Sequence, residues 1–429
     1  MNSLRFVLTY CANKNLELHQ VDIKTAFLNG VPEEDVYMHC PLGYPHEKEE
    51  GTCLKLERWL YGLKQSPRCW YKCLSDNFKK LDFYPSQEDP CLFFNNKRED
   101  LCFVFVHVDD MIIGENAACV EDLKKEMKKV FVLDDMGEAN FILGIKLERN
   151  REEKTITLSQ SLYVDKLLNE YGMSQCHPVL TPMIPNSHLQ PATDTNTCKD
   201  FNYRKAIGSL NYLAMCSRPD LAFITSALAQ FLEKPSMDHV AAFKQVLRYL
   251  QGTRDFGLKL DGKKGLESLE GYCDSDWGSN FDGKSFSGHG IQCGGLIAWK
   301  TKKQPIVSLS STEAELRSLS ELTQDLLWLK RLMEEFNINP MINVRCDNQG
   351  AIALCHNPLY HHKTRHINIR LNWIRDNVLR KEIDLQYVPT TQMWADLFTK
   401  GLGRPKHQDF SAQLGLIAVS SKKACKSNN

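Results

Sequence analysis

Two adjacent aspartates, Asp109 and Asp110, stand between two apolar runs and are the first candidates for chemistry. The runs 101–106 and 111–113 are rich in β-branched, aromatic and other apolar residues, which predicts two buried strands. Because adjacent aspartates favour a turn and are costly on a buried strand, we expect a tight hairpin with both carboxylates at its tip. Such a tip can bind a divalent cation, and a solvated turn without a metal is the alternative.

A second set of acids stands where helices and strands are expected to begin or end. Strand ends and helix starts on one side of a sheet can converge, and four carboxylates can hold two divalent cations about 4 Å apart. That arrangement activates a water and stabilises the leaving oxygen in phosphodiester cleavage. Each acid alone fits a helix cap or a surface charge better, so the prediction depends on the whole set. Its members are Asp274, Glu315, Asp347 and Asp396.

The elements that would position this second set predict a mixed sheet. From residue 269 three short strands precede a long helix over 312–336, with Ser310 or Ser311 as its N-cap. Two further strands, INVRCD and IDLQYV, then alternate with helices. These helices are predicted at 349–355, 367–378 and 394–402.

The N-terminal part contains a third candidate acid, which, like the hairpin aspartates, stands near the end of a predicted strand. Asp22 lies near the end of a strand predicted over 18–23, after an amphipathic helical pattern, and Asn29-Gly30 marks a turn. A helix after Pro67 carries aromatic and basic residues together, which fits contact with a nucleic-acid strand or, alternatively, a core helix with a solvated basic face. The basic residues concerned are Lys64, Arg68 and Lys72.

Between the two candidate sites the pattern is mostly structural. An amphipathic helix over 120–130 is followed by two strands and a helix, and a segment rich in Pro, Thr and Asn, 177–199, has the composition of a linker. We place a domain boundary there. Three more helices are expected, at 203–216, 220–232 and 238–250.

Composition limits the class of protein. The chain has 429 residues, which favours two or three domains. Lys plus Arg and Asp plus Glu both number 53, so affinity for nucleic acid must come from local basic patches. The 16 cysteines without CxxC pairs, and an N-terminus unlike a signal peptide, predict reduced thiols in an intracellular protein. No apolar run is long enough to span a bilayer.

Two other metal sites are rejected. The segment DSDWGSNFDG lacks the glycine and the final glutamate of a calcium loop. A cluster of histidines near Cys355 lacks the paired cysteines and spacing of a zinc finger, and its interleaved basic residues fit contact with backbone phosphates better. The histidines are His356, His361, His362 and His366, and the basic residues are Lys363, Arg365 and Arg370.

Taken together, the motifs resemble the polymerase end of copia-type long-terminal-repeat retrotransposons, a reverse transcriptase followed by ribonuclease H, over residues 1–405. The resemblance implies that Asp22, Asp109 and Asp110 form a palm triad holding two magnesium ions. It also implies that the second acid set forms the ribonuclease site. The motifs are HQVDIKTAFLNG, WLYGLKQSPRCWYK, HVDDMII, NFILGI, YRKAIGSLNYLA, RPDLAF, GYCDSDW, SLSSTEAEL, RCDNQGAIAL, KTRHINIR and ADLFTKGL.

The resemblance assigns two substrate-contacting residues and shows two departures. Phe27 looks like the aromatic that lies under the incoming sugar, and Gln65 is similar to a residue that contacts nucleotide and template; ordinary packing is the alternative for both. His107 stands where the family has tyrosine, so the contact to the primer end is altered. This chain starts at the helix before Asp22, so the family's preceding fingers region, whose basic residues grip the nucleotide triphosphate, is expected to be missing, and we expect weak polymerisation by this chain alone. The protease and integrase of a complete element are expected upstream.

The predicted fold is α+β: a reverse-transcriptase palm and thumb without a complete fingers region, a helical connection, and a ribonuclease-H-like mixed α/β domain. The predicted domains are 1–176, 177–265 and 266–405, with a disordered tail over 406–429. The predicted cofactor is Mg²⁺, with Mn²⁺ as an alternative.

The expected partners are an RNA template, a DNA primer, deoxynucleoside triphosphates, RNA–DNA hybrid and other parts of a Pol polyprotein, but no membrane. The predicted location is the cytoplasm or a virus-like particle, with the nucleus as an alternative. The competing hypothesis is a degenerate or co-opted remnant that binds nucleic acid without polymerase activity.

Overall fold

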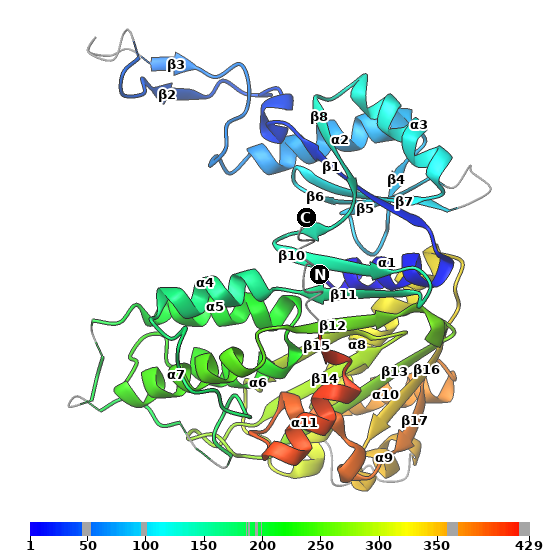
Figure 1. The fold of residues 1–429 in the computed structure, drawn as a ribbon. Coiled ribbons are helices and arrows are strands. Elements are labelled where there is room, and N and C mark those ends of the chain that lie inside the picture. The colour runs from blue at the N-terminus through cyan, green and yellow to red at the C-terminus, as the bar shows by residue number, and fades with distance from the viewer. Residues whose placement is uncertain are drawn as a thin grey trace, which may run out of the picture. The chain divides into compact units, whose positions relative to one another are not determined.

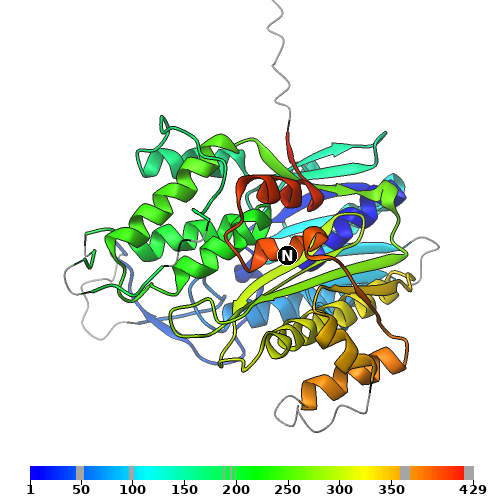
Figure 2. The ribbon, with the colours of Figure 1, turned by 90° about the horizontal axis from the view of Figure 1, so that it is seen from below.

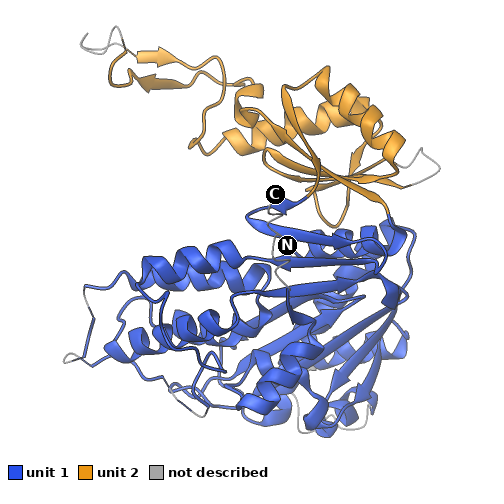
Figure 3. Cartoon of the chain, in the orientation of Figure 1, with its two compact units in different colours: residues 1–15, 140–429 blue, residues 16–139 orange. Residues whose placement is uncertain are grey.

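The computed structural model describes residues 1–44, 53–95, 101–185, 187, 189–193, 196–198, 200–357 and 368–419. The chain divides into two compact units (Figure 3). One is Leu16–Ala139, and the other combines Met1–Asn15 with Asn140–Asn429. This division falls at other positions than the boundaries expected at 177 and 266, so the three predicted domains stay a prediction.

The unit Leu16–Ala139 is built on a six-stranded sheet of order β4-β5-β6-β7-β1-β8 (Figure 1). Alternate residues of the central strands share a hydrophobic core with α2 and α3, so both helices cover one face of the sheet. The elements are β1 Glu17–Ile23, η1 Ala26–Asn29, β2 Tyr37–His39, β3 Cys53–Lys55, α2 Ser66–Lys80, β4 Tyr84–Pro85, β5 Leu92–Asn95, β6 Cys102–His107, β7 Asp110–Glu115, α3 Ala117–Lys128 and β8 Leu133–Glu138.

The second unit contains the expected mixed sheet, in the order β15-β14-β13-β16-β17. Strands β13, β14 and β15 pair antiparallel, whereas β16 and β17 join in parallel. Gly288 and Gly290 let the segment after β17 approach the sheet, because a Cβ there would lie within 2.7 Å of Phe398 or Trp394. The elements are β13 Ser268–Asp276, β14 Phe286–Gln292, β15 Leu296–Lys303, α8 Ser311–Glu335, β16 Met341–Cys346, α9 Gln349–His356, α10 Asn368–Leu379, β17 Asp384–Tyr387, η5 Thr390–Gln392 and η6 Trp394–Phe398.

A second sheet and a group of helices complete this unit. The sheet has the order β18-β12-β11-β10-β9, and the helices α4 to α7 share one hydrophobic core. Ser310 caps α8 by accepting a hydrogen bond from the Glu313 amide, as predicted. The elements are α1 Asn2–Lys14, β9 Phe141–Ile142, β10 Ile145–Asn150, β11 Thr155–Ser159, α4 Ser161–Glu170, α5 Tyr203–Cys216, η2 Pro219–Leu221, α6 Ala222–Ala229, α7 Met237–Gly252, β12 Phe256–Asp261, η3 Gly262–Lys264, α11 Arg404–Gln413 and β18 Leu416–Ala418.

The N-terminal helix α1 packs against strands that are distant in sequence. The Arg5 guanidinium donates to the Ile297 carbonyl at 2.6 Å and lies 3.8 Å from the centre of the Trp299 ring. It also donates to the Met215 carbonyl at 2.9 Å. Arg5 therefore ties α1 to β15 and to the end of α5.

The predicted disordered tail is wrong for residues 406–418. The helix α11 buries Phe410, and β18 pairs with β12 through Leu416 and Leu258. The helix predicted over 394–402 is instead the 3-10 helix η6, and α11 begins separately with Pro405 in its first turn. Apolar spacing after Pro405 explains the order, because it provides α11 and β18 with a buried face. Residues 420–429 lie outside the described residues.

A buried polar network joins η2, α7 and α11, and Figures 1 and 2 show α11 (red) beside the green helices of this unit. Arg218 donates to both oxygens of Asp220, at 3.0 and 2.7 Å. The Tyr249 hydroxyl donates to Asp220 at 2.7 Å and lies 3.1 Å from His407 Nε2. The network fixes the start of α11, which also carries Lys406.

Replacing Asp220 with alanine should lower the free energy of unfolding by about 3–5 kcal/mol, because it leaves the buried Arg218 charge without its partner. Urea unfolding of the purified chain measures the loss. Asp255→Ala is the control, since exposed Asp255 pairs with Arg254 at 3.6 Å and such surface pairs contribute about 0–1 kcal/mol. Equal losses in the two variants would contradict this role of the network.

The same network predicts a loss of stability in acid. Burial lowers the pKa of His407, Asp220 opposes that shift, and Arg218 adds to it. The folded protein therefore holds His407 neutral, and its contribution to stability is complete above the unfolded pKa of about 6.5 and is lost as pH falls below that value. Unfolding measured at several pH values should show a smaller acid loss for His407→Gln than for the wild type. Parallel curves would refute the assignment.

Candidate functional site

The hairpin predicted around the paired aspartates is confirmed. Strand β6 ends at His107, β7 begins at its cross-strand partner Asp110, and Val108 and Asp109 form the two-residue turn. Val108 has a φ of 60°, which is strained for a β-branched residue. The Trp70 indole donates to the Val108 carbonyl at 2.8 Å and holds this turn in place.

Asp22 joins the hairpin acids at one end of β1. It is the direct cross-strand partner of Asp110, so the two side chains lie on the same face of the sheet, opposite the face that α2 and α3 cover. The Ile23 amide donates to the Asp109 carbonyl at 2.9 Å, which brings the turn beside the end of β1. The structure thus places all three acids of the predicted triad together.

Negative charge gathers at this place. Burial raises the pKa of Asp22, the charges of Asp109 and Asp110 raise it further, and Lys24 partly opposes them. Gln20 Nε2 donates to Asp110 Oδ1 at 3.2 Å. A divalent cation would relieve the repulsion among three oxygen donors, so the residues fit one chemically. Among the described residues, however, both groups with ligand atoms all within 4.8 Å of one another lie in the other unit.

The residues around the triad lie as follows. Phe27 is buried in η1, with its ring centre 4.5 Å from that of Tyr61, and Gln65 is exposed at the start of α2. His107 is exposed at the end of β6. On α2 the aromatic residues Trp70 and Phe78 are buried, whereas the basic residues face solvent, so this helix has a basic outer face. Arg68 and Lys72 are the basic residues on the first two turns of α2, Lys64 lies just before the helix, and all three are exposed.

The second unit holds a tighter carboxylate group. Asp274 lies near the end of β13, Asp347 directly follows the parallel neighbour β16, and Glu315 lies in the second turn of α8. One oxygen from each of these three acids lies within 4.8 Å of the other two. Strand ends and a helix start therefore converge, as the sequence predicts.

Asp396 reaches this group through a lysine. Lys400 Nζ lies 2.7 Å from Asp396 Oδ1 and 3.1 Å from Asp274 Oδ2. Lys406 contacts the other oxygen of Asp396, and the Thr399 hydroxyl donates to Asp274. The fourth predicted acid thus stands beside the group, and two ammonium ions balance the buried charge.

Burial perturbs the pKa values of the acids in this group. It raises the pKa of Asp274 to about 6, against the attraction of Lys400, and raises the pKa of Glu315 well above its ordinary value. Glu315 Oε1 accepts from the Ser275 amide at 3.0 Å, whereas the buried Oε2 has no hydrogen-bond partner in the described part of the chain. An unsatisfied acceptor beside two further carboxylates fits a divalent cation with oxygen ligands.

Sequence reasoning missed several residues of this site. Lys400 follows Asp396 by four positions, and Thr390 donates to Asp347 Oδ2 at 2.7 Å. Burial raises the pKa of Asp276 to about 8, and that carboxyl accepts a hydrogen bond from the amide of Phe286, its cross-strand partner at the start of β14. A helical i to i+4 spacing between Asp396 and Lys400 was the available signal.

Other expectations lie partly beyond the described residues. His356 Nε2 lies 3.3 Å from the Leu385 carbonyl, and Arg370 is half-buried on α10. No helix in the described ranges is both long and apolar enough to cross a membrane. The expected residues outside those ranges are His361, His362, Lys363, Arg365 and His366.

A protein-family model and several known proteins are similar to this chain. The protein family "Reverse transcriptase (RNA-dependent DNA polymerase)" matches residues 1–185. The chain is 36% identical over 95% of its length to a retrovirus-related Pol polyprotein from transposon TNT 1-94 of Nicotiana tabacum, and 35% identical over 97% to one from transposon RE1 of Arabidopsis thaliana. It spans 31% and 28% of those two proteins, about a third of their length.

A solved structure shares the fold. The foamy viral protease-reverse transcriptase in complex with RNA/DNA hybrid matches 87% of this chain and 44% of its own, with a TM-score of 0.50 and 13% identity. A likeness at this identity shows the fold alone, and it confirms the predicted fold class.

Proposed function

Because this chain belongs to the family of copia-type retrotransposon Pol polyproteins, we propose that it is part of an RNA-directed DNA polymerase that also carries a ribonuclease H. The observation that carries the proposal is the gathering of two separate carboxylate sets, each at the ends of neighbouring strands of a sheet. We assign polymerisation to residues 1–176 and RNA cleavage to residues 266–405. The substrates are RNA template, DNA primer, deoxynucleoside triphosphates and RNA–DNA hybrid.

At the polymerase site, Asp22, Asp109 and Asp110 would hold Mg²⁺ or Mn²⁺. When bound at either site, the cations polarise phosphoryl oxygens and activate the attacking oxygen. Asp22 and Asp110 share one face of the sheet, so a cation held by both would lie on that face. Phe27 and Gln65 are assigned to the incoming nucleotide, and the basic outer face of α2 supplies contacts to backbone phosphates.

At the nuclease site, the chain supplies four acids and two lysines. Asp274, Glu315, Asp347 and Asp396 would hold the cations, and Glu315 Oε2 is a buried acceptor without a hydrogen-bond partner among the described residues. Lys400 orients Asp274 and Asp396 by binding both. Because Asp274 and Asp396 are each 1% exposed, their negative charges act at low dielectric, where they would attract a bound cation strongly.

One pair of assays tests the proposal. The purified chain is given a homopolymer RNA template with a DNA primer, and separately an RNA–DNA hybrid labelled in the RNA, with Mg²⁺ or Mn²⁺ and with a chelator. We expect metal-dependent nucleotide incorporation and RNA cleavage. His107, which is exposed where the family has tyrosine, favours the competing hypothesis of a remnant without polymerase activity. Hybrid binding without incorporation would support that remnant, and loss of both reactions would reject the proposal.

A further inference from the structure

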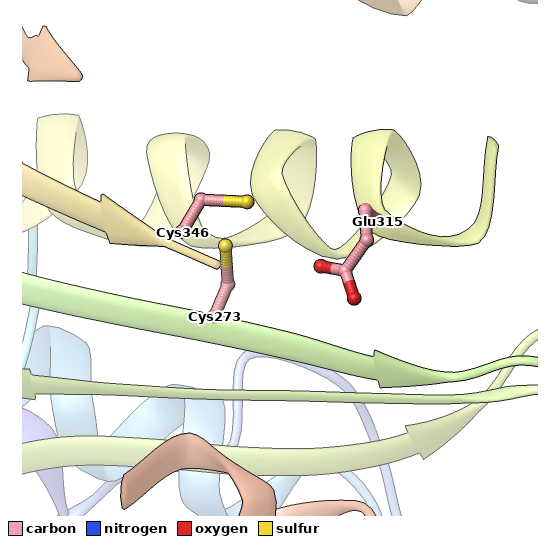
Figure 4. A group of neighbouring side chains, drawn as sticks. All are labelled: Cys273, Glu315 and Cys346. Carbon is pink, nitrogen blue, oxygen red and sulfur yellow. The ribbon is translucent and has the colours of Figure 1, made fainter. Parts of the chain in front are cut away.

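Two buried thiols lie beside the nuclease carboxylates and have no part in the proposed function. Cys273 and Cys346 directly precede Asp274 and Asp347 on the parallel neighbours β13 and β16. Because side chains alternate along a strand, Cys273 points to the opposite face of β13 from Asp274. Figure 4 shows the two sulfur atoms turned toward each other, with the Glu315 carboxylate facing the same space.

The distances suit one metal ion. One ligand atom each from Cys273, Cys346 and Glu315 lies within 4.8 Å of the other two. Two thiolates bound to one tetrahedral zinc, at about 2.3 Å each, are about 3.8 Å apart. Two sulfurs and one carboxylate favour Zn²⁺ or Cd²⁺ over Mg²⁺, which prefers oxygen ligands.

Two further observations point to a ligand here. Glu315 is 4% exposed, and its Oε2 has no hydrogen-bond partner within the described ranges, so a buried acceptor stands next to the thiols. The Asn348 amide donates to Cys346 Sγ at 3.4 Å, and such outer hydrogen bonds orient a metal ligand and tune its basicity. Cys273 and Cys346 are fully buried, so a cation would enter past Glu315 and the half-buried Asp347.

We propose that Cys273, Cys346 and Glu315 form an inhibitory site for a thiophilic divalent cation, Zn²⁺ or Cd²⁺. Glu315 belongs both to this thiol site and to the oxygen group with Asp274 and Asp347. A cation bound by the thiols holds the Glu315 carboxylate and withdraws it from the oxygen group. The proposal that the site binds a cation does not depend on the proposed ribonuclease function, whereas the proposal that this cation inhibits cleavage does.

Cadmium binding to the intact chain tests the site without any activity. With a thiol-free reductant present, calorimetry and the thiolate-to-cadmium ultraviolet absorption count the bound equivalents. We expect Cys273→Ser and Cys346→Ser to bind one equivalent fewer than the wild type. Cys293→Ser is the matched control, because Cys293 is 2% exposed and lies outside the cluster. Equal counts in the wild type and both cluster variants, or an equal loss in the control, would overturn the site.

A measurement on the wild type keeps the test valid if a cluster variant fails to fold. The cadmium-113 resonance of the tightest site should report mixed sulfur and oxygen ligands, and an all-oxygen or single-sulfur signal would overturn the proposal.

Inhibition is measured separately. When the free Zn²⁺ concentration is about ten times the dissociation constant of the thiol site, the fraction of protein molecules with that site empty falls roughly tenfold. Mg²⁺-dependent cleavage by the wild type should fall by about the same factor, and cleavage by Cys273→Ser should stay near its own zinc-free rate. Equal inhibition of both proteins overturns the inhibitory role. Cadmium binding without cleavage in any protein rejects the proposed nuclease and leaves the metal site standing.

Discussion

Replacing Asp274 with asparagine is expected to reduce metal-dependent cleavage of the RNA strand in a hybrid by about 10²–10³-fold. Asp274 is 1% exposed, and one of its oxygens lies within 4.8 Å of ligand oxygens of Glu315 and Asp347. Asparagine has the same shape but removes one negative ligand from the group. The amide oxygen of asparagine can still accept the hydrogen bond from the Thr399 hydroxyl, so the fold should persist. Gel analysis of labelled RNA measures the rate, and circular dichroism verifies the fold.

Asp282→Asn is the matched control for this prediction. Asp282 is exposed in the turn after β13 and pairs with Lys303 at 2.8 Å. Exposed ion pairs contribute about 0–1 kcal/mol, so the change should leave both stability and cleavage nearly unaltered. If the two variants lose activity to the same extent, or if Asp274→Asn cleaves normally, Asp274 does not have the assigned role.

The hairpin at Asp109 and Asp110 was predictable because its causes are local. Apolar runs on both sides determine the strands, and the polar pair between them marks the turn, which the structure places at Val108 and Asp109, with Asp110 at the start of β7. The edge positions of Asp274 and Asp347 followed from the same kind of reasoning. Both expectations depended only on neighbours a few residues away.

Contacts between distant segments left no such signal. The guanidinium of Arg5 binds the carbonyl of Ile297, which is 292 positions away, so nothing near α1 indicated that it packs against β15. The spacing between Asp396 and Lys400 could have identified Lys400 as a partner of Asp396. Its contact with Asp274 could not be predicted, because Asp274 lies on β13, 126 positions away in the sequence. The helix α11 had a local signal in Pro405 and the apolar residues after it, and reading this segment as a tail overlooked that signal.

Replacing Asp110 with asparagine is expected to lower primer extension by about 10²–10³-fold relative to the unmodified chain. Asp110 lies opposite Asp22 in the β1–β7 pair, so both carboxylates lie on the face of the sheet where we propose that the cation binds, and an amide cannot replace the lost charge. The amide oxygen can still accept the bond from Gln20, so the strand pairing should persist. Because the sequence predicts weak synthesis by this chain alone, labelled nucleotide incorporation over long incubation is the suitable measurement.

Asp122→Asn is the control, since Asp122 is exposed on α3 and pairs with Lys125 at 3.2 Å. Incorporation that is unchanged in Asp110→Asn, or equally reduced in Asp122→Asn, would show that the hairpin acids do not carry polymerisation.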